Sequence, residues 1–267
     1  MSGTRVDHAV GEAGANGWVG TGRPGEGAVG AGGLGGPGAR RGLGSARPLT
    51  LARDRLLTVP EALAPLFPDG GLRRGSTVMI QPGPAPGATT LALAVAVAAS
   101  QTGSWCAAVG LPTLGLVMAA GLGVCLERLA LVPDPGPRWP VVAAALVDAV
   151  DLVVLRPSGR CQAGDARRLA ARARERGAVL IPVGTGWPGG ADLRLTVLAG
   201  VWDGLGQGHG HLRTRMVLVA AEGRGAAARE RRVRLWLPGP SGTVERHDAE
   251  ATVETPGTRA TPVAVAG

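Results

Sequence analysis

Residues 76–90 read STVMIQPGPAPGATT and lead into the Ala- and Leu-rich run 91–99. The first six residues are short and mostly apolar, a pattern typical of a strand buried on both faces of a parallel sheet. The next nine hold three prolines and two glycines, which end the strand before the helical run begins. A strand, a Gly-rich turn and a helix in this order are the context of a phosphate-binding loop. The stretch therefore predicts an α/β fold with its first crossover here.

The alternation of strand-like and helix-like segments continues along the chain. Further buried strands are expected at residues 104–109, 129–132, 151–155 and 178–183. Helices are expected at residues 89–99, 114–123, 141–150 and 165–176, the last one capped by Asp165. After Gly190, alternating strands linked by Gly-rich turns follow at residues 193–202, 213–221 and 232–237. We expect a mainly parallel sheet flanked by helices, with an antiparallel C-terminal extension.

The ends of the chain differ from its centre in composition. Residues 1–47 are dominated by Gly and Ala with scattered Arg, and residues 243–267 alternate Thr, Pro, Ala and Glu. Such segments cannot bury enough apolar surface to offset their ordering entropy. We expect a single core at residues 48–242 between two disordered tails.

The charge of the chain comes from arginine alone. All 28 basic residues are arginine, against 20 acidic residues, which gives a formal net charge of +8. Part of this basicity reflects a GC-rich codon bias, and the rest favours an acidic partner, either nucleic acid or an acidic protein surface. Three scattered cysteines and the lack of a membrane-length apolar run predict a protein of the reducing cytoplasm without disulfides, zinc or membrane contact.

The phosphate loop lacks the residues that bind a triphosphate. Pro82 replaces the first glycine, and Ala88 stands where a lysine would reach the β and γ oxygens. Two further prolines remove N–H donors, so the residues that remain of a cofactor site are Gly83, Gly87, Ala88, Thr89 and Thr90. The favoured interpretation is a plain Pro/Gly turn with Thr89 or Thr90 capping the helix. A weak anion or ATP site at the helix N-terminus stays open as an alternative.

The segment from Gly70 through Leu91 resembles RecA, as does the stretch from Thr214 to Leu237, which looks like the antiparallel strands that close a RecA core. The resemblance covers residues 49–242. Its departures from RecA all point to a loss of ATPase and DNA-binding residues. Arg156 stands where the metal-binding aspartate of the Walker B strand would be, and Gly110 where the strand should deliver a catalytic glutamate. Both DNA-binding loops are shortened or absent.

A shortened RecA-like core with degenerate Walker motifs is similar to the ImuA family, in particular its ImuA-prime branch. That resemblance implies an SOS-induced accessory protein of translesion DNA synthesis after DNA damage, part of a mutasome. Its implied partners are ImuB, which is an inactive Y-family polymerase homologue, and an error-prone DnaE-type polymerase. It implies no catalytic residue, no metal and no obligate cofactor, so the chain would be a pseudo-ATPase that acts through protein–protein interaction.

Other residues are candidates for contacts. His209 and His211 could bind a metal, but two ligands rarely hold zinc, and a Gly-rich hairpin or partner contact is preferred. Trp139 and Trp187 lie in Pro/Gly-rich segments and are candidate exposed anchors for a partner, whereas Trp105, Trp202 and Trp236 lie in strands and are expected to be buried or half-buried. The candidates for partner or nucleic-acid contact are Arg167, Arg168, Arg172, Arg213, Arg215, Arg231, Arg232 and Trp187.

Three hypotheses follow for the function. The leading one is a non-catalytic adaptor that docks a repair polymerase partner. The second is a weak nucleotide-binding ATPase or switch of the RecA superfamily, and the third is a plain nucleic-acid-binding protein that uses its basic surface.

Overall fold

The computed structural model describes residues 55–205 and 210–247. Its parallel strands are β3 (Val78–Gln81), β4 (Cys106–Val109), β5 (Leu129–Val132), β6 (Leu152–Leu155) and β7 (Val179–Pro182). Its α-helices are α2 (Ala88–Gln101), α3 (Leu116–Gly121), α4 (Trp139–Ala149) and α5 (Ala163–Arg176). The later strands are β8 (Leu193–Leu205), β9 (Gly210–Gly223), β10 (Arg231–Trp236) and β11 (Glu245–Arg246). Shorter elements are β1 (Leu56–Leu57), η1 (Glu61–Leu66), β2 (Leu72–Arg73), η2 (Leu126–Arg128), η3 (Gly136–Arg138) and η4 (Gly225–Ala227).

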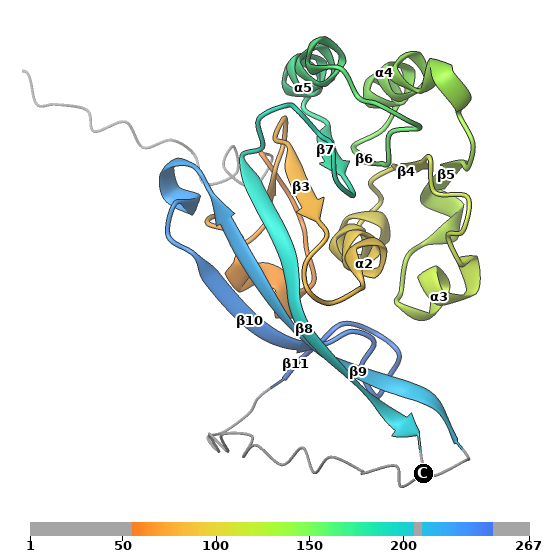
Figure 1. Ribbon diagram of the computed structural model, residues 1–267, viewed down its shortest axis with the longest axis vertical. Coiled ribbons are helices and arrows are strands. Elements are labelled where there is room, and N and C mark those ends of the chain that lie inside the picture. Colours follow the sequence, from red (N-terminus) through yellow and green to blue (C-terminus); the bar gives the residue numbers. More distant parts are fainter. Residues whose placement is uncertain (1–54, 206–209, 248–267) are drawn as a thin grey trace, which may run out of the picture. The chain divides into compact units, whose positions relative to one another are not determined.

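Apart from the short β1–β2 pair, the strands form two sheets that meet at β3 and β7. One sheet has the order β5-β4-β6-β7 and is parallel throughout, and the other has the order β11-β10-β9-β8-β3. Two parallel bridges, Thr77 to Leu180 and Ile80 to Val183, join the two sheets side by side. The crossover from β3 through α2 to β4 therefore passes over β7 and β6 (Figure 1). Neither of the two common doubly wound strand orders places its first two strands so far apart.

Alternate residues of the parallel strands enter two separate cores. In β6, Leu152 and Val154 pack in the cluster under α2, and Val153 and Leu155 pack in the cluster under α4 and α5. This period of two is the geometry of a strand whose faces are both covered. It explains why these strands read as continuous apolar runs in the sequence.

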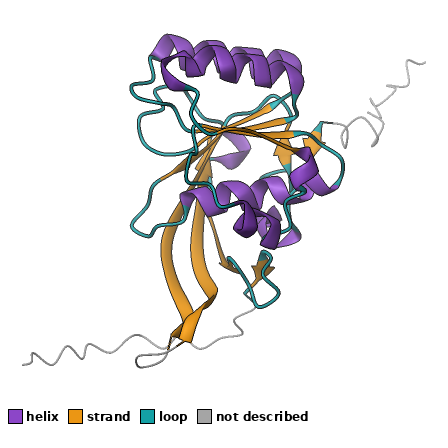
Figure 2. Ribbon diagram, turned by 90° about the vertical axis from the view of Figure 1, so that its right-hand side faces the viewer, coloured by secondary structure: helices purple, strands orange, loops and turns teal. Residues whose placement is uncertain are grey.

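The antiparallel strands β8, β9 and β10 are covered on one face only. Their inward residues, such as Leu195, Val217 and Leu235, belong to the α2 cluster and are fully or almost fully buried. Their other face contributes no residue to either cluster among the described residues. Figure 2 shows the long strand pair running past the helical layers, with helices to one side of it.

The α/β class, the parallel sheet and the antiparallel extension are confirmed, and each expected strand and helix is present within a few residues. The cap of α5 is not Asp165. The helix begins at Ala163 after Gln162, and Asp165 lies in its first turn, where it accepts a bond from Arg168. The described strands continue to β11, beyond residue 242, where the core was expected to end. The expected tail 1–47 lies outside the described residues, as do residues 248–267 of the other tail.

The described helices are all too short or too polar to cross a lipid bilayer.

A substitution at Leu180 tests the packing where the two sheets meet. Its side chain is fully buried in the α4/α5 cluster, and its backbone forms one of the two bridges to β3. We expect Leu180→Ala to lower the free energy of unfolding by about 2–5 kcal/mol, because it leaves a cavity in a packed core. Urea denaturation followed by circular dichroism measures the change. Val117→Ala, at an 89% exposed position, should change stability by less than about 0.5 kcal/mol. Equal losses in both variants would contradict this assignment of the core.

Asp148 joins α4 to α5 and predicts a pH-dependent contribution to stability. Its carboxylate accepts bonds from Arg172 and, at 3.1 Å, from Arg176. The hydrogen bond from Arg172, with the charges of both arginines, holds the pKa of Asp148 below its usual value.

Asp148→Asn should therefore destabilise the protein at neutral pH. The difference from the unaltered protein should disappear as the pH falls through the lowered folded-state pKa, below about 3.9. Thermal unfolding across pH measures it, with Asp69→Asn as the control, since the Asp69 carboxylate makes no ion pair in the described chain. A difference that persists unchanged at low pH would rule out the ion pair as its source.

Candidate functional site at the start of helix α2

The segment between β3 and α2 lies against strand β8. A Cβ at Gly83 would stand 2.2 Å from the carbonyl oxygen of Val197, so only glycine fits there. The N–H of Ala85 points to the same carbonyl at 3.4 Å. The prolines on either side leave this segment few donors for an anion. The turn is thus held by β8.

Helix α2 begins without a side-chain cap. Its N-cap is Gly87, with φ of +121°, a conformation that strongly favours glycine. The expectation that Thr89 or Thr90 caps the helix is wrong, because no side-chain cap bond forms. Leu91 donates the first intrahelical bond, to Gly87. The preceding N–H groups, of Ala88, Thr89 and Thr90, have no partner within the helix, as at any helix start.

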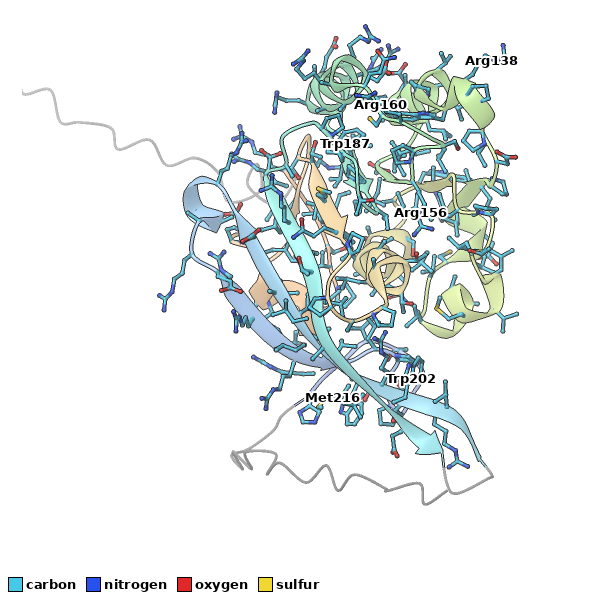
Figure 3. The ribbon with its side chains drawn as sticks, viewed as in Figure 1. Arg138, Arg156, Arg160, Trp187, Trp202 and Met216 are labelled. Carbon is cyan, nitrogen blue, oxygen red and sulfur yellow. The ribbon has the colours of Figure 1, made fainter. Side chains whose placement is uncertain are left out.

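Arg156 binds the hydroxyl of Thr89. Arg156 follows the carboxyl end of β6 and lies next to α2 (Figure 3). Its guanidinium donates a hydrogen bond of 3.0 Å to Thr89 Oγ1. Its own N–H donates to the carbonyl of Val109 in β4, which fixes its backbone. The side chain of Thr89 is therefore held by a cation from the neighbouring strand. This is the hydroxyl that would bind Mg²⁺ in a working phosphate loop.

Gly110, at the end of β4, leaves no room for a side chain. It has φ of +71°, and a Cβ there would lie 2.0 Å from the carbonyl oxygen of Arg156. The ends of β4 and β6 therefore pack backbone to backbone. A catalytic glutamate at this position would require the end of β6 to move.

Arg215 is part of the same site and not of an outer basic surface. Its side chain is 4% exposed and donates to the carbonyl of Pro86 at 2.5 Å. It lies so close to Gly87 that a Cβ there would meet the guanidinium at 2.5 Å. Burial lowers its pKa, and its Nε has no hydrogen-bond partner. The prediction that Arg215 lies on the surface and contacts a partner or nucleic acid is therefore wrong, because its side chain is buried.

The sequence did carry a signal for the burial of Arg215. The residue is in phase with Val217 and Val219, which lie on the core face of β9 with 1% and 0% exposure. The hydrogen bond from Arg156 to Thr89 could not be predicted from a local sequence pattern, because the two residues are 67 positions apart.

Two guanidinium groups thus touch the segment that starts α2. The N-terminal end of a helix carries a partial positive charge, so cations placed there repel a metal ion and attract an anion. In the described chain no group of three or more acidic, histidine or cysteine side chains could hold a metal. The arrangement can bind a simple anion, and it opposes Mg²⁺.

The other candidate arginines divide between helix α5 and the antiparallel strands β9 and β10. Arg168 and Arg172 on α5 are paired with Asp165 and Asp148, and Arg167 is exposed. On β10, Arg232 is paired with Glu230 and Arg231 donates to the carbonyl of Ala226; Arg213 on β9 is exposed. Helix α5 packs on β7, and β3, β8 and β9 lie between that strand and β10. The two basic zones therefore stay separate.

The tryptophans contradict their expected positions. Trp187 and Trp139, expected to be exposed, are 7% and 3% exposed and pack in the α4/α5 cluster. Trp139 begins α4, and the segment around Trp187 folds back onto the α5 residue Ala166, as the close approach of Gly189 to both shows. Trp187 is thus a core residue. The strand residues Trp105 and Trp202 are 45% and 43% exposed, and Arg128 and Arg215 lie over their rings. Trp236 is half-buried, as expected.

The sequence also made predictions for the cysteines and histidines. All three cysteines are free, as expected, and burial raises the pKa of Cys106 to about 12. His209 and the side chain of His211 lie outside the described residues.

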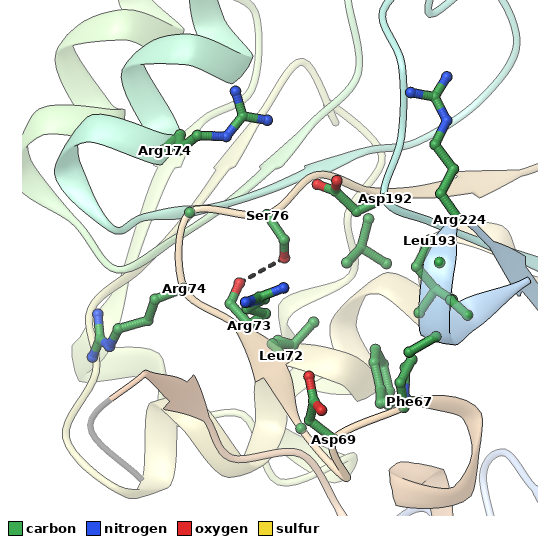
Figure 4. Close-up of a pocket in the computed structure, with 17 residues that line it drawn as sticks. Phe67, Asp69, Leu72, Arg73, Arg74, Ser76, Arg174, Asp192, Leu193 and Arg224 are labelled. Carbon is green, nitrogen blue, oxygen red and sulfur yellow. Dashed lines mark hydrogen bonds between the residues drawn. The ribbon is translucent and has the colours of Figure 1, made fainter. Parts of the chain in front are cut away.

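A cavity of about 510 Å³ lies at the amino ends of β3 and β8, away from the start of α2 (Figure 4). Its floor is apolar, with Phe67, Leu72 and Leu193, and arginines such as Arg174 and Arg224 stand around it. Two carboxylates, of Asp69 and Asp192, share this space, so the charges are mixed. Ligands of open α/β sheets usually bind at the opposite, carboxyl ends of the strands.

Gly110 provides a test of the packing around Arg156. Gly110→Ala should lower the free energy of unfolding by about 1–3 kcal/mol. The new Cβ would clash with the Arg156 carbonyl oxygen, and residue 110 has a positive φ that alanine disfavours. Gly121→Ala is the matched control, since its Cβ would meet no atom within 4 Å. It should be neutral or stabilising by up to about 1 kcal/mol. Urea denaturation compares the two, and a neutral Gly110→Ala would contradict the close packing of β4 and β6.

Two comparisons with known proteins give matches. The family model described as the MT3502 N-terminal domain matches residues 65–189, from η1 through β7. The chain is also 35% identical over 147 residues to the uncharacterized protein Rv3395c of Mycobacterium tuberculosis (strain ATCC 25618 / H37Rv). That alignment covers 54% of this chain and 69% of the relative. The chain therefore belongs to the family of Rv3395c.

Proposed function

We propose that the chain is a non-catalytic, RecA-like accessory protein of the ImuA and ImuA-prime type. In this role it docks an inactive Y-family polymerase homologue, similar to ImuB, and an error-prone DnaE-type polymerase during SOS-induced translesion synthesis. It holds partners together and does not hydrolyse ATP.

The bond from Arg156 to Thr89 is the observation that carries this proposal. In a RecA-type ATPase the hydroxyl at this position and a carboxylate at the end of β6 would hold Mg²⁺. Here the residue that follows β6 is the cation Arg156, and it donates a hydrogen bond of 3.0 Å to the Thr89 hydroxyl. The close packing of Gly110 excludes the general base as well. The hydroxyl that would bind the metal is thus engaged by Arg156, and neither the metal-binding carboxylate nor the carboxylate that would activate water is present at its expected position.

The arrangement of strands supports the RecA-like part of the proposal. The phosphate-loop segment leaves β3, which lies between β7 and β8 and not beside β4. Three antiparallel ladders then extend the sheet beyond β8. A parallel sheet closed by antiparallel strands is what the resemblance of residues 49–242 to RecA implies.

A second candidate function is weak nucleotide or anion binding without turnover. The two guanidiniums at the start of α2, together with the unpaired first-turn N–H groups, favour a phosphate group over a metal ion. This site would bind inorganic phosphate and free ATP alike, because Mg²⁺ contributes nothing to it. DNA binding through the exposed arginines of α5 and β9 remains a third proposal.

Calorimetry and co-purification test the leading proposal together. We expect titration with Mg-ATP to show no heat that depends on Mg²⁺ and no phosphate release. We also expect the full chain, co-expressed with the inactive Y-family polymerase homologue of the same genome, to co-elute with it in size-exclusion chromatography. Deleting the gene should abolish mutagenesis induced by DNA damage.

Two results would overturn this function. One is ATP turnover that Thr89→Val abolishes, which would make the site a working ATPase. The other is a chain that forms no complex with the polymerase homologue and whose deletion leaves induced mutagenesis unchanged.

A further inference from the structure

Strand β5 is a free edge of the parallel sheet in the described chain. The order β5-β4-β6-β7 gives it a neighbour on one side only, which is β4. The carbonyl of Val132 accepts the N–H of Gly110, so the polar backbone groups of Val132 point toward β4. Because this direction alternates along a strand, the N–H and carbonyl of Leu131 point the other way, out of the sheet. Such an edge is a template for a further strand.

Exposed apolar side chains gather beside this edge. Half of the ten large apolar side chains that are exposed in the described chain lie between residues 116 and 131. They are Leu116, Val117, Met118, Leu126 and Leu131. Figure 1 shows α3 next to β5 at the free end of the sheet. The edge strand and the layer beside it are thus both open to solvent.

Leu131 lies on the face of the sheet that α3 covers. Leu129 packs against the α2 cluster, which also contains Ala119 of α3, and Leu131 is two residues further along the strand. Val117 stands two residues from the buried Ala119, which is about 200° round the helix, so it points away from the sheet. The edge patch therefore consists of Leu126, Leu131 and the flank of α3 that faces β5.

The edge patch lies in a part of the chain that carries no net charge. Residues 104–147 hold four charged side chains, two of each sign: Glu127, Arg128, Asp134 and Arg138. The whole chain carries +8, so two copies of it repel each other on average. That repulsion is weakest where the charges of a region cancel. A second copy is thus better tolerated at this edge than at the arginine-rich elements.

Strand β5 is complementary to a second copy of itself. If two β5 strands lie antiparallel with Leu131 opposite Leu131, the N–H of each Leu131 donates to the carbonyl of the other. Leu129 then stands opposite Pro133, which has no N–H but whose carbonyl accepts the N–H of Leu129. The nearest charged residues on either side of the strand, Arg128 and Asp134, come opposite each other with complementary sign.

The charges of these two residues are not neutralised within the described chain. Arg128 donates to the carbonyl of Gly103 and lies over the ring of Trp105, and the carboxylate of Asp134 accepts the N–H of Gly136. Neither residue forms an ion pair with another described residue. The antiparallel pairing therefore adds a favourable charge contact and brings no like charges together at the ends of β5.

A second copy also covers the apolar side chains beside the strand. Two antiparallel strands related by a twofold axis perpendicular to the sheet place both α3 helices on the same face. A lone strand would satisfy the backbone but leave Leu126 and Leu131 exposed, and a pair of such short strands is marginal by itself. The second copy brings its own edge patch against the first, and the burial of both patches stabilises the pair.

We propose that this chain forms a twofold-symmetric dimer through β5, in which the two antiparallel β5 strands join the sheets of both copies and the two edge patches cover each other. The interface is isologous, with Leu131 on the twofold axis. The proposal does not rest on the adaptor function, which requires other partners.

Sedimentation velocity of the full chain over a range of concentrations tests the dimer. Leu131→Pro removes an N–H on the free side of β5 and none that points to β4, so it should raise the dimer dissociation constant at least about tenfold. Leu131→Val keeps the N–H and an apolar side chain, and should raise it less than about threefold. Leu131→Glu should act like the proline. Val201→Glu is the matched control, at a 62% exposed position on β8, and should leave the dimer unchanged.

Cross-linking tests the antiparallel register. The two Leu131 Cα atoms would stand about 5.5 Å apart across the axis, which is within the range that a disulfide spans. Leu131→Cys should therefore give a covalent dimer on oxidation with copper phenanthroline, and Val201→Cys should not. Both variants carry Cys125→Ser, because the other two native cysteines are buried.

Three results would overturn the proposal. A chain that stays monomeric at every concentration would leave the β5 edge to a strand of another protein. A dimer that survives both Leu131→Pro and Leu131→Glu, or that Val201→Glu dissociates, would have its interface elsewhere. A dimer that Leu131→Glu weakens but that Leu131→Cys does not cross-link would pair in another register. Circular dichroism of each variant shows that its fold is retained.

Discussion

The hydrogen bond between Arg156 and Thr89 determines what the carboxyl edge of this sheet can do. It joins the end of β6 to the first turn of α2, so the two elements that would hold Mg²⁺ in a phosphate-loop enzyme hold each other. Gly110 makes this approach feasible by bringing the backbone of β4 against that of β6. Arg215 adds a second cation from β9, bonded to Pro86. Three strands thus converge on one helix start, and each contributes a group that is ill suited to a metal-bound triphosphate.

The architecture could be predicted from the sequence because it depends on runs of apolar residues. Strands such as β6, with Leu152 to Leu155, are covered on both faces, and their continuous hydrophobicity marks them directly. Of the antiparallel strands, β10 alternates polar and apolar residues, because only one of its faces is covered, whereas β9 is continuously apolar from Met216 to Ala221. The pattern therefore marked the covered face of β10 but not that of β9.

The positions of single side chains were harder to predict, because they depend on contacts far along the chain. Trp187 stands among prolines and glycines, yet its segment folds back onto α5 and buries it. Trp202 lies in a strand, yet that strand runs past the helices and leaves it 43% exposed. The absence of a lysine from residues 82–90 and of a carboxylate at positions 110 and 156 was visible in the sequence. That Arg156 would bind Thr89 was not, since no local pattern links residues 67 positions apart.

The packing at Gly110 also limits how this lineage could change. A carboxylate at that position would need the end of β6 to withdraw first, since even a methyl group would meet the Arg156 carbonyl at 2.0 Å. Withdrawal of β6 would in turn break the bond from Arg156 to Thr89. A single substitution at position 110 therefore cannot add a carboxylate to this edge of the sheet without loss of stability, and a second change that moves β6 would have to accompany it.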